Sequence, residues 1–484
     1  MENINTKMLR ATKWTTITEF IAKLVIPISN MILARLLAPE AFGVVATVTM
    51  IISFADMFSD SGFQKYLIQR EFKNKNETFE FANVAFWTNL IISLIIYGII
   101  IIFSDRIANL VGSDGLGNVI IIACLQLPIT AISSIQIALY RRDFNFKVLF
   151  YNRLIIIISP FLITIPLAFF GFNYWSLIIG NLISSFVSAF LLTITSSWKP
   201  KLRYNFEILK KMFSFSIWTL FESVAIWLTT WIDTFVIGNV LSSYYLGVYK
   251  TSTSLVNSLM SIVTAATTPI LFSGLSRLQN SEKEFEDLFY NFQKIVAMLI
   301  IPLGVGLFSY RELATKIMLG NKWLEASFIV GIWSLTSVLV ILFSHFSSEV
   351  YRSLGRPKLS LVAQLLHLVF LIPTLLISVK YGFMTLVIAR SLIRLQAILV
   401  HFFIMHFVIK ISVLKSLKNM LPIFLSVTIM YLFSVIFNRN YQTILMQFIG
   451  IILCIIIYFA VLILFKEQRN QIKYFIYKVR RKEL

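Results

Sequence analysis

Charge is scarce in this chain. Asp, Glu, Lys and Arg make up 14% of its 484 residues, whereas soluble domains average about a quarter. Hydrophobic residues account for 58%, and the mean hydropathy is +0.81. This balance excludes an ordinary solvated domain and predicts an all-α polytopic membrane protein, because a helix needs about twenty apolar residues to cross a bilayer.

The residues of common cofactor sites are also few or scattered. Cys124 and Cys454 both lie in apolar runs, so the sequence indicates neither a disulfide framework nor a thiolate metal site. The four histidines lack metal-ligand spacing, and no GxxxxGK[ST] motif for ATP is present. We therefore expect no cofactor, no resident metal and no enzymatic active site. If the protein consumes energy, the lack of a nucleotide motif leaves a gradient of Na+ or H+, or later use of a product, as the source.

Apolar segments are abundant, and about fourteen are long enough to span a bilayer. The candidate spans cover residues 11–34, 41–60, 80–104, 118–139, 150–170, 174–195, 213–237, 245–270, 291–309, 326–349, 359–379, 383–407, 417–437 and 443–465. If the N-terminus is cytoplasmic, an even number of spans places the C-terminus on the same side.

The net charge of +20 follows this topology. Most of the 43 Lys and Arg residues lie in the loops and termini predicted to face inward. The outward turns hold seven: Arg35, Arg106, Arg311, Lys316, Lys322, Lys380 and Arg439. That asymmetry is the positive-inside pattern of membrane proteins. The basic excess therefore indicates topology and contact with anionic lipid, and we expect no nucleic-acid partner.

Short motifs recur along the chain in the same order. MILARLLAPEAFGVV (31–45) and FVIGNVLSSYYLGVY (235–249) align at an offset of 204, which pairs Gly43 with Gly247. Each of these motifs covers the end of one predicted helix, the turn and the start of the next helix, and we call it a corner. Three more corners repeat at similar spacing. The repeat predicts two six-helix lobes of the same orientation, at 1–200 and 201–410, followed by a helix pair and a basic cytoplasmic tail at 411–484. Such duplicated lobes are typical of transporters.

Ionisable residues inside the spans are the candidate site. Each costs about 2.5–3.5 kcal/mol on insertion scales, so they must pair or line water. The bases proposed to form a cationic substrate site are Lys23, Lys250, Arg390 and Arg394. The residues proposed for a polar, ion-coupling cavity are Glu19, Asn30, Asp56, Glu222, Asp233, Ser254, Asn257 and Ser261.

Each of these residues also has a purely structural interpretation. Glu19 and Lys23 stand four apart and could form only an ion pair along one helix. Asp233 lies near the outer end of its span, where exposure costs little. Polar stripes also serve as ordinary helix contacts in membranes. Lys250 fits a structural role least, because it heads a stripe of five polar residues at helical spacing.

Two segments carry a family resemblance. The segments at 32–70 and 231–279 resemble the two signatures of bacterial polysaccharide-lipid flippases, the O-antigen and capsule (Wzx-type) exporters. These belong to the multidrug/oligosaccharidyl-lipid/polysaccharide exporter superfamily. The resemblance implies a V-shaped cavity between two lobes, with bases in the first two spans of each lobe engaging a diphosphate. Lys23 and Lys250 match that placement, whereas Arg390 and Arg394 do not.

The resemblance also implies a cargo and a setting. The substrate would be an oligosaccharide repeat unit on undecaprenyl diphosphate, moved from the inner to the outer leaflet of the bacterial cytoplasmic membrane. The process would be biosynthesis of O-antigen, lipopolysaccharide or capsule, with polysaccharide polymerase machinery as a further partner.

Two other functions remain open. The first is an ion-coupled drug/cation antiporter of the same fold, whose cavity would favour acids and aromatics. The second is a membrane polysaccharide polymerase or lipid-dependent glycosyltransferase. That enzyme would need a sizeable loop outside the membrane, and the predicted outward turns are short.

Overall fold

The computed structural model describes residues 4–471 and 473, apart from residue 61. In this part of the chain, fourteen helical segments are long and apolar enough to cross a membrane, and each overlaps one of the fourteen candidate spans, with bounds that differ at the ends. No strand occurs among the described residues. The predicted all-α fold of a multi-pass membrane protein is therefore confirmed.

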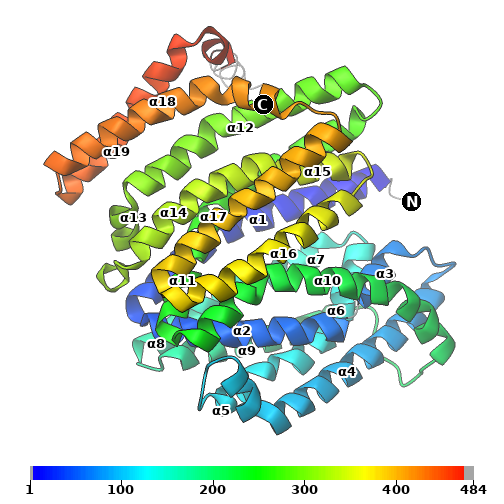
Figure 1. The fold of residues 1–484 in the computed structure, drawn as a ribbon. Helices are drawn as coiled ribbons and strands as arrows, with labels where there is room; N and C mark the ends of the chain where they lie inside the picture. Colours follow the sequence, from blue (N-terminus) through cyan, green and yellow to red (C-terminus); the bar gives the residue numbers. More distant parts are fainter. Residues whose placement is uncertain (1–3, 61, 472, 474–484) are drawn as a thin grey trace. The chain divides into compact units, whose positions relative to one another are not determined.

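The chain divides into two compact units (Figure 1). The first contains Met1–Thr251 and Leu375–Phe383, and the second contains Ser252–Thr374 and Met384–Leu484. These units are defined by contacts, whereas the predicted lobes (1–200, 201–410 and 411–484) are defined by the sequence repeat. The division into lobes therefore stays a prediction.

The first unit contains the following helices: α1 (Ile4–Leu36), α2 (Pro39–Asp60), α3 (Phe63–Gln69), α4 (Lys75–Leu110), α5 (Gly117–Cys124), α6 (Gln126–Arg142), α7 (Phe146–Ser159), the π-helical turn η1 (Pro160–Thr164), α8 (Ile165–Phe169), α9 (Tyr174–Thr195), α10 (Phe206–Val240), the start of α11 (Ser243–Arg277) and the 3-10 turn η4 (Val379–Tyr381). Helix α10 packs against α2 and α4, and α6 packs against α4 and α9.

The second unit contains the rest of α11 and the following elements: α12 (Glu282–Ser309), α13 (Arg311–Met318), the 3-10 turn η2 (Asn321–Trp323), α14 (Ala326–Val340), the π-helical turn η3 (Ile341–His345), α15 (Phe346–Ser353), α16 (Lys358–Ser378) as far as Thr374, α17 (Phe383–Phe403) from Met384 onward, the π-helical turn η5 (Ile404–Val408), α18 (Val413–Asn440) and α19 (Ile444–Leu464). Helix α18 lies between α12 and α19 (Figure 1).

Polar side chains mark several helix starts. Asn74 accepts a 2.9 Å hydrogen bond from the backbone N–H of Glu77, and the Glu77 carboxylate accepts one from the backbone N–H of Lys73. Asn205, Ser412 and Thr443 cap α10, α18 and α19 in the same way. These caps satisfy N–H groups that a helix leaves open at its first turn.

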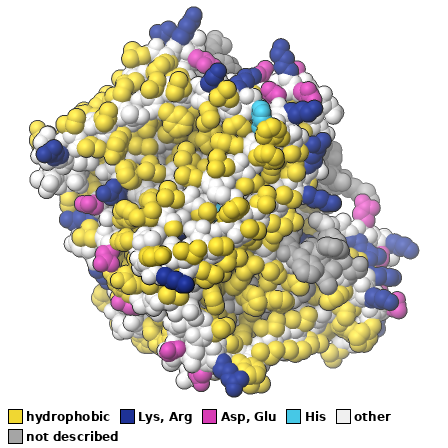
Figure 2. Space-filling view, viewed as in Figure 1, with side chains coloured by type: hydrophobic (Ala, Val, Ile, Leu, Met, Phe, Trp, Pro, Cys, Tyr) yellow, Lys and Arg dark blue, Asp and Glu magenta, His cyan; other side chains and the backbone are white. Residues whose placement is uncertain are grey.

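Hydrophobic side chains also dominate the surface. They make up much of the face shown in Figure 2. Many large apolar residues are exposed, among them Ile102 (75%), Phe169 (75%) and Leu464 (77%). In water such a surface would drive aggregation, but it is the surface that a hydrocarbon core requires.

Candidate functional site: a polar cavity in the first unit

The first unit contains a cavity of about 910 Å3. About half of its lining residues carry hydroxyl or amide side chains, from α2, α3, α4, α6, α7, α9 and α10. Among the described lining residues, two are ionisable, Asp56 and Lys65. Helices of the first unit thus line a polar but nearly uncharged space.

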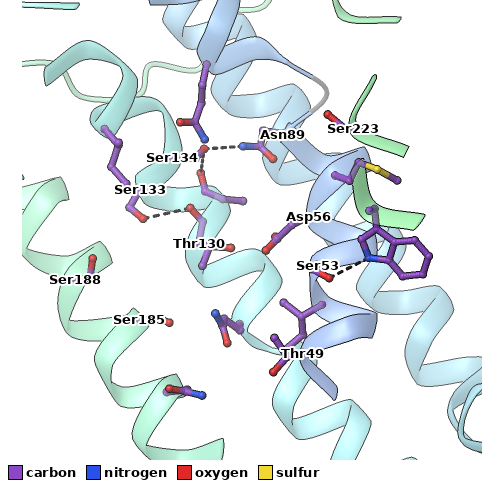
Figure 3. A pocket seen from close by; sticks show the side chains of 18 of the residues that line it. Thr49, Ser53, Asp56, Asn89, Thr130, Ser133, Ser134, Ser185, Ser188 and Ser223 are labelled. Atoms are coloured by element: carbon purple, nitrogen blue, oxygen red, sulfur yellow. Dashed lines mark hydrogen bonds between the residues drawn. The ribbon is translucent and has the colours of Figure 1, made fainter. Parts of the chain in front are cut away.

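Helix α2 contributes one wall of this cavity. Thr49, Ser53 and Asp56 share a face of the helix and line the cavity, and in Figure 3 the Asp56 side chain points toward Thr130 of α6. Thr49 and Ser53 donate to the carbonyls of Val45 and Met50 at 2.7 and 2.9 Å. These internal bonds satisfy the hydroxyl protons and leave oxygen lone pairs to accept from a ligand.

Helices α6 and α9 form the opposite wall. Gln126, Thr130 and Ser133 on α6 repeat at intervals of four and three residues, as do Asn181, Ser185 and Ser188 on α9. That spacing keeps each set on one helical face. The sequence analysis missed these residues because it searched for stripes only in spans that contain charges; the same periodicity would have identified them.

Two tryptophans of α10 complete the lining. The Trp227 indole donates a 3.0 Å hydrogen bond to the Ser53 hydroxyl, and its ring lies 4.8 Å from the ring of Phe54. Trp231 also lines the cavity. Flat aromatic faces beside hydroxyl and amide groups can stack on the C–H faces of sugar rings while the polar groups bind their hydroxyls.

A short helix carries the cavity residues Gln64 and Lys65. This helix, α3, is anchored by Phe63 and Leu67, which are fully buried in an apolar core. Arg142 donates to the carbonyls of Leu67 and Arg70 at 2.7 and 2.5 Å, and so satisfies carbonyls at the helix end. The anchoring fixes the helix that carries Lys65, an exposed residue at the cavity.

Lys250 lies next to this cavity and forms an ion pair. Its Nζ is 3.3 Å from Asp233 Oδ1 and 4.7 Å from the centroid of the Trp231 ring. Asp233 is 4% exposed and accepts further hydrogen bonds from the Tyr249 hydroxyl (2.8 Å) and the Thr234 N–H (2.7 Å). The interpretation of Asp233 as an exposed interfacial acid is therefore wrong, because the Asp233 side chain turns into the protein.

The other predicted residues of this unit lie on α1 or have no described side chain. Glu19 and Asn30 are exposed and Lys23 is half-buried. Asn30 borders a small separate cavity of about 70 Å3 with Arg153. The side chain of Glu222 lies outside the described residues. A role for these residues in binding stays a prediction.

In the second unit, Trp333 of α14 brings three predicted residues together. Its indole donates to Asn257 Oδ1 at 3.1 Å, and the guanidinium groups of Arg390 and Arg394 lie 5.5 and 4.0 Å from its ring centroid. Arg394 also donates to Thr336 Oγ1 and Ser337 Oγ at 2.9 and 3.0 Å. Cation–π contacts and hydroxyl acceptors thus stabilise two buried or half-buried cations.

The remaining predicted residues, Ser254 and Ser261, lie on α11 of the second unit. Ser254 is exposed, and the half-buried Ser261 donates to the Ser258 carbonyl at 2.7 Å. The four predicted bases are thus shared between the two units, Lys23 and Lys250 in the first and Arg390 and Arg394 in the second. Their assembly into one cationic site stays a prediction.

Comparison with known proteins places the chain in a family. The sequence profile of the family described as "Polysaccharide biosynthesis protein" matches residues 32–328. The chain belongs to this family. That confirms the resemblance noted for the segments at 32–70 and 231–279.

Proteins similar in sequence to this chain come from several bacteria. The chain is 24% identical over 315 residues to the succinoglycan biosynthesis transport protein ExoT of Rhizobium meliloti, with 65% of this chain and 63% of ExoT covered. It is 21% identical to the lipopolysaccharide biosynthesis protein WzxC of Escherichia coli, with 74% and 70% covered. An uncharacterized membrane protein in the cps region of Klebsiella pneumoniae is 22% identical, with 83% of each chain covered.

Solved structures show the same fold. The lipid II flippase MurJ in an inward closed conformation superimposes with a TM-score of 0.76 at 17% identity, covering 94% of this chain and 99% of MurJ. An inward-facing multidrug resistance transporter of the MATE family and MOP superfamily gives a TM-score of 0.61 at 16% identity, covering 81% and 96%. The family member described here therefore has the helical architecture of these membrane transporters.

Proposed function

We propose that this protein is a flippase for lipid-linked oligosaccharides. It would carry a repeat unit on undecaprenyl diphosphate from the inner to the outer leaflet of the cytoplasmic membrane by alternating access. The N- and C-termini would be cytoplasmic, and a polysaccharide polymerase would consume the product. The family, the similarity to ExoT, which is named a transport protein, and the fold shared with the flippase MurJ support this proposal.

The observation that carries the proposal is the polar cavity of the first unit. Cavities of about 300–1,000 Å3 hold drug-sized ligands, and the cavity of about 910 Å3 is at the upper end of this range. Its hydroxyls and amides can exchange hydrogen bonds with sugar hydroxyls, and Trp227 and Trp231 offer stacking faces. Because it has little net charge, we assign it to the saccharide and assign the cationic residues to the diphosphate.

The test is translocation in proteoliposomes. The substrate is a polyprenyl-diphosphate oligosaccharide whose sugar is scored for accessibility from each side, with and without gradients of H+ and Na+. Protein-dependent movement supports the flippase function, and the gradient dependence identifies the driving ion. Absence of movement with a repeat unit from the source organism would contradict the proposal.

A pair of neighbouring variants links the movement to the cavity. Ser185 lines the cavity, whereas Phe186 is 60% exposed on the same helix. Ser185→Trp should fill part of the cavity and abolish movement of the oligosaccharide. Phe186→Trp should leave movement close to that of the unmodified protein. Equal transport by the two variants would show that the sugar does not pass through this cavity.

A drug/cation antiporter is the second candidate, and Asp56 favours it. A carboxylate in a cavity lined partly by tryptophan could bind an organic cation and exchange it for a proton or sodium ion. Efflux of small organic cations in the same vesicles, without movement of the lipid-linked sugar, would establish this function instead.

A further inference from the structure

The second unit contains a separate basic cavity of about 640 Å3. It lies between the end of α12, helix α13, the end of α18 and the start of α19. Its charged lining residues are Arg311, Lys316, Arg439 and Glu312. The lining therefore has a net charge of +2 at neutral pH.

The concentration of bases here is unexpected for this side of the protein. Arg311, Lys316 and Arg439 are three of the seven Lys and Arg residues in the turns that the charge pattern predicts to face outward. Positive-inside topology keeps such turns poor in basic residues. Topology therefore does not account for three of them around one cavity, whereas an anionic ligand would.

The geometry also holds one of these bases in place. The Arg311 guanidinium lies 5.2 Å from the centroid of the Phe308 ring, a cation–π distance. Gly331 leaves the room for its aliphatic stem, since a Cβ at Gly331 would lie 2.7 Å from Arg311 Cδ. A guanidinium fixed in this way can bind two oxygens of a phosphate with little loss of side-chain entropy.

Uncharged donors surround the bases. Asn321, Gln442 and Gln447 line the same cavity, as does Tyr431. Tyr431 and Phe308 also line an adjoining apolar cavity of about 350 Å3, whose other lining residues are almost all aliphatic or aromatic. A phosphate attached to a hydrocarbon chain could use both cavities, whereas free phosphate could use only the basic one.

We propose that Arg311, Lys316 and Arg439 form a binding site for a phosphate or diphosphate group at the end of the bundle predicted to face outward. The site is independent of the saccharide cavity and of the transport assay. It would hold the phosphate of a lipid on that side of the membrane. Measurements of binding therefore test this site, whatever the outcome of the translocation assay.

Binding to the full-length protein in an uncharged detergent tests the proposal. Farnesyl diphosphate, a short-chain phosphatidylglycerol and inorganic diphosphate serve as three probes in titration calorimetry. Tighter binding of farnesyl diphosphate than of the other two assigns the site to prenyl diphosphates. Similar binding of both lipids assigns it to lipid phosphates in general, and equal binding of inorganic diphosphate assigns it to the free anion.

Variants identify where the probe binds. Arg311→Gln combined with Lys316→Gln and Arg439→Gln should weaken binding of the best probe by about tenfold or more, because charge-assisted hydrogen bonds are lost. Lys380→Gln removes an exposed base outside this cavity and should change nothing. Glu312→Gln raises the net charge of the lining and should tighten binding several-fold.

Two results would overturn the site. One is absence of saturable binding for all three probes. The other is binding by the triple variant that matches the unmodified protein. Gly331→Ala guards against an indirect effect of charge removal, because it retains every charge and displaces Arg311; it should weaken binding while Lys380→Gln does not.

Discussion

Lys250 and Asp233 form an ion pair in which neither charge can be removed alone at low cost. Asp233 is 4% exposed, and the Lys250 side chain is 20% exposed. Removing one partner of a buried pair leaves an uncompensated charge, which costs about 3–5 kcal/mol. Loss of transport after Lys250→Ala would therefore not by itself show that Lys250 contacts the cargo.

A double-mutant cycle separates the two roles of Lys250. We expect Lys250→Ala to lower the midpoint of thermal unfolding markedly, and Asp233→Asn to do so as well. The double variant should be more stable than the sum of the single effects predicts, because it leaves no lone charge. Thermal unfolding of the purified proteins in detergent measures all four forms.

Transport by the double variant then shows whether Lys250 contacts the cargo. If Lys250 engages the diphosphate of the cargo, the folded double variant should move less than a tenth of the oligosaccharide moved by the unmodified protein. Near-normal movement of the oligosaccharide by the double variant would show that the ion pair has only a structural role. The control is the neutral neighbouring substitution Thr251→Ser, which should behave as the unmodified protein does.

At the scale of single residues, the sequence predicts which side chains are unusual but not their partners. It singled out Asp233 and Lys250, yet their contact arises only when α10 and α11 turn back on each other. Lys294 is a harder case. It is 1% exposed in α12 and pairs with Glu467, 173 residues away. A single sequence contains no signal for such a long-range contact.

At the scale of helices, the two repeated corners pack against each other. A Cβ at Gly43 would lie 1.8 Å from the carbonyl oxygen of Ser243, and a Cβ at Gly247 would lie 1.7 Å from that of Pro39. The offset of 204 that pairs Gly43 with Gly247 also pairs Pro39 with Ser243. The contact between α2 and α11 is thus reciprocal, as expected for two copies of one motif.

Alanine at these glycines tests the close packing. We expect Gly43→Ala or Gly247→Ala to destabilise the fold by about 1–3 kcal/mol or more, because backbone atoms have to move apart. Gly98→Ala on α4 is the control. A Cβ there meets nothing within 4 Å, so the change should be neutral or stabilise by up to about 1 kcal/mol. Denaturant unfolding in detergent gives the three values, and a neutral Gly43→Ala would contradict the close packing.

The polar stripes show what periodicity can and cannot predict at this scale. Thr49, Ser53 and Asp56 repeat at helical spacing, and the structure places all three at the cavity. Lys250, Ser254 and Asn257 repeat equally well, but Asn257 is bonded to Trp333 in the second unit. Periodicity identifies a shared face, whereas the packing of neighbouring helices decides what that face meets.

At the scale of the whole molecule, composition was sufficient for the fold class. Fourteen apolar segments separated by polar loops leave few alternatives to fourteen spans, since each span must satisfy its own backbone in lipid. The cavity could not be derived in this way. Its lining comes from eight helices, and most of its polar residues are uncharged Ser, Thr, Asn and Gln, which also occur in helices that line no cavity.

The proposed alternating-access mechanism predicts that the reciprocal corner contact breaks during transport. By the charge pattern, both corners lie on the outward side, so their packing would close that side. The reporter is Ser133→Cys in the cavity, in a background where the buried Cys124 and Cys454 are alanine. A membrane-impermeant maleimide should label it from the inner side in this background.

Weakening the contact between the two corners should change the side from which Ser133→Cys is labelled. With Gly43→Ala and Gly247→Ala added, the Cβ atoms force α2 and α11 apart, and labelling of Ser133→Cys from the outer side should rise at least several-fold at the expense of the inner side. Lys380→Cys, exposed in a turn predicted to be outward, is the topology control and should label from outside in both backgrounds. Unchanged sidedness of Ser133→Cys, with the control labelled as expected, would mean that the corner contact does not gate this cavity.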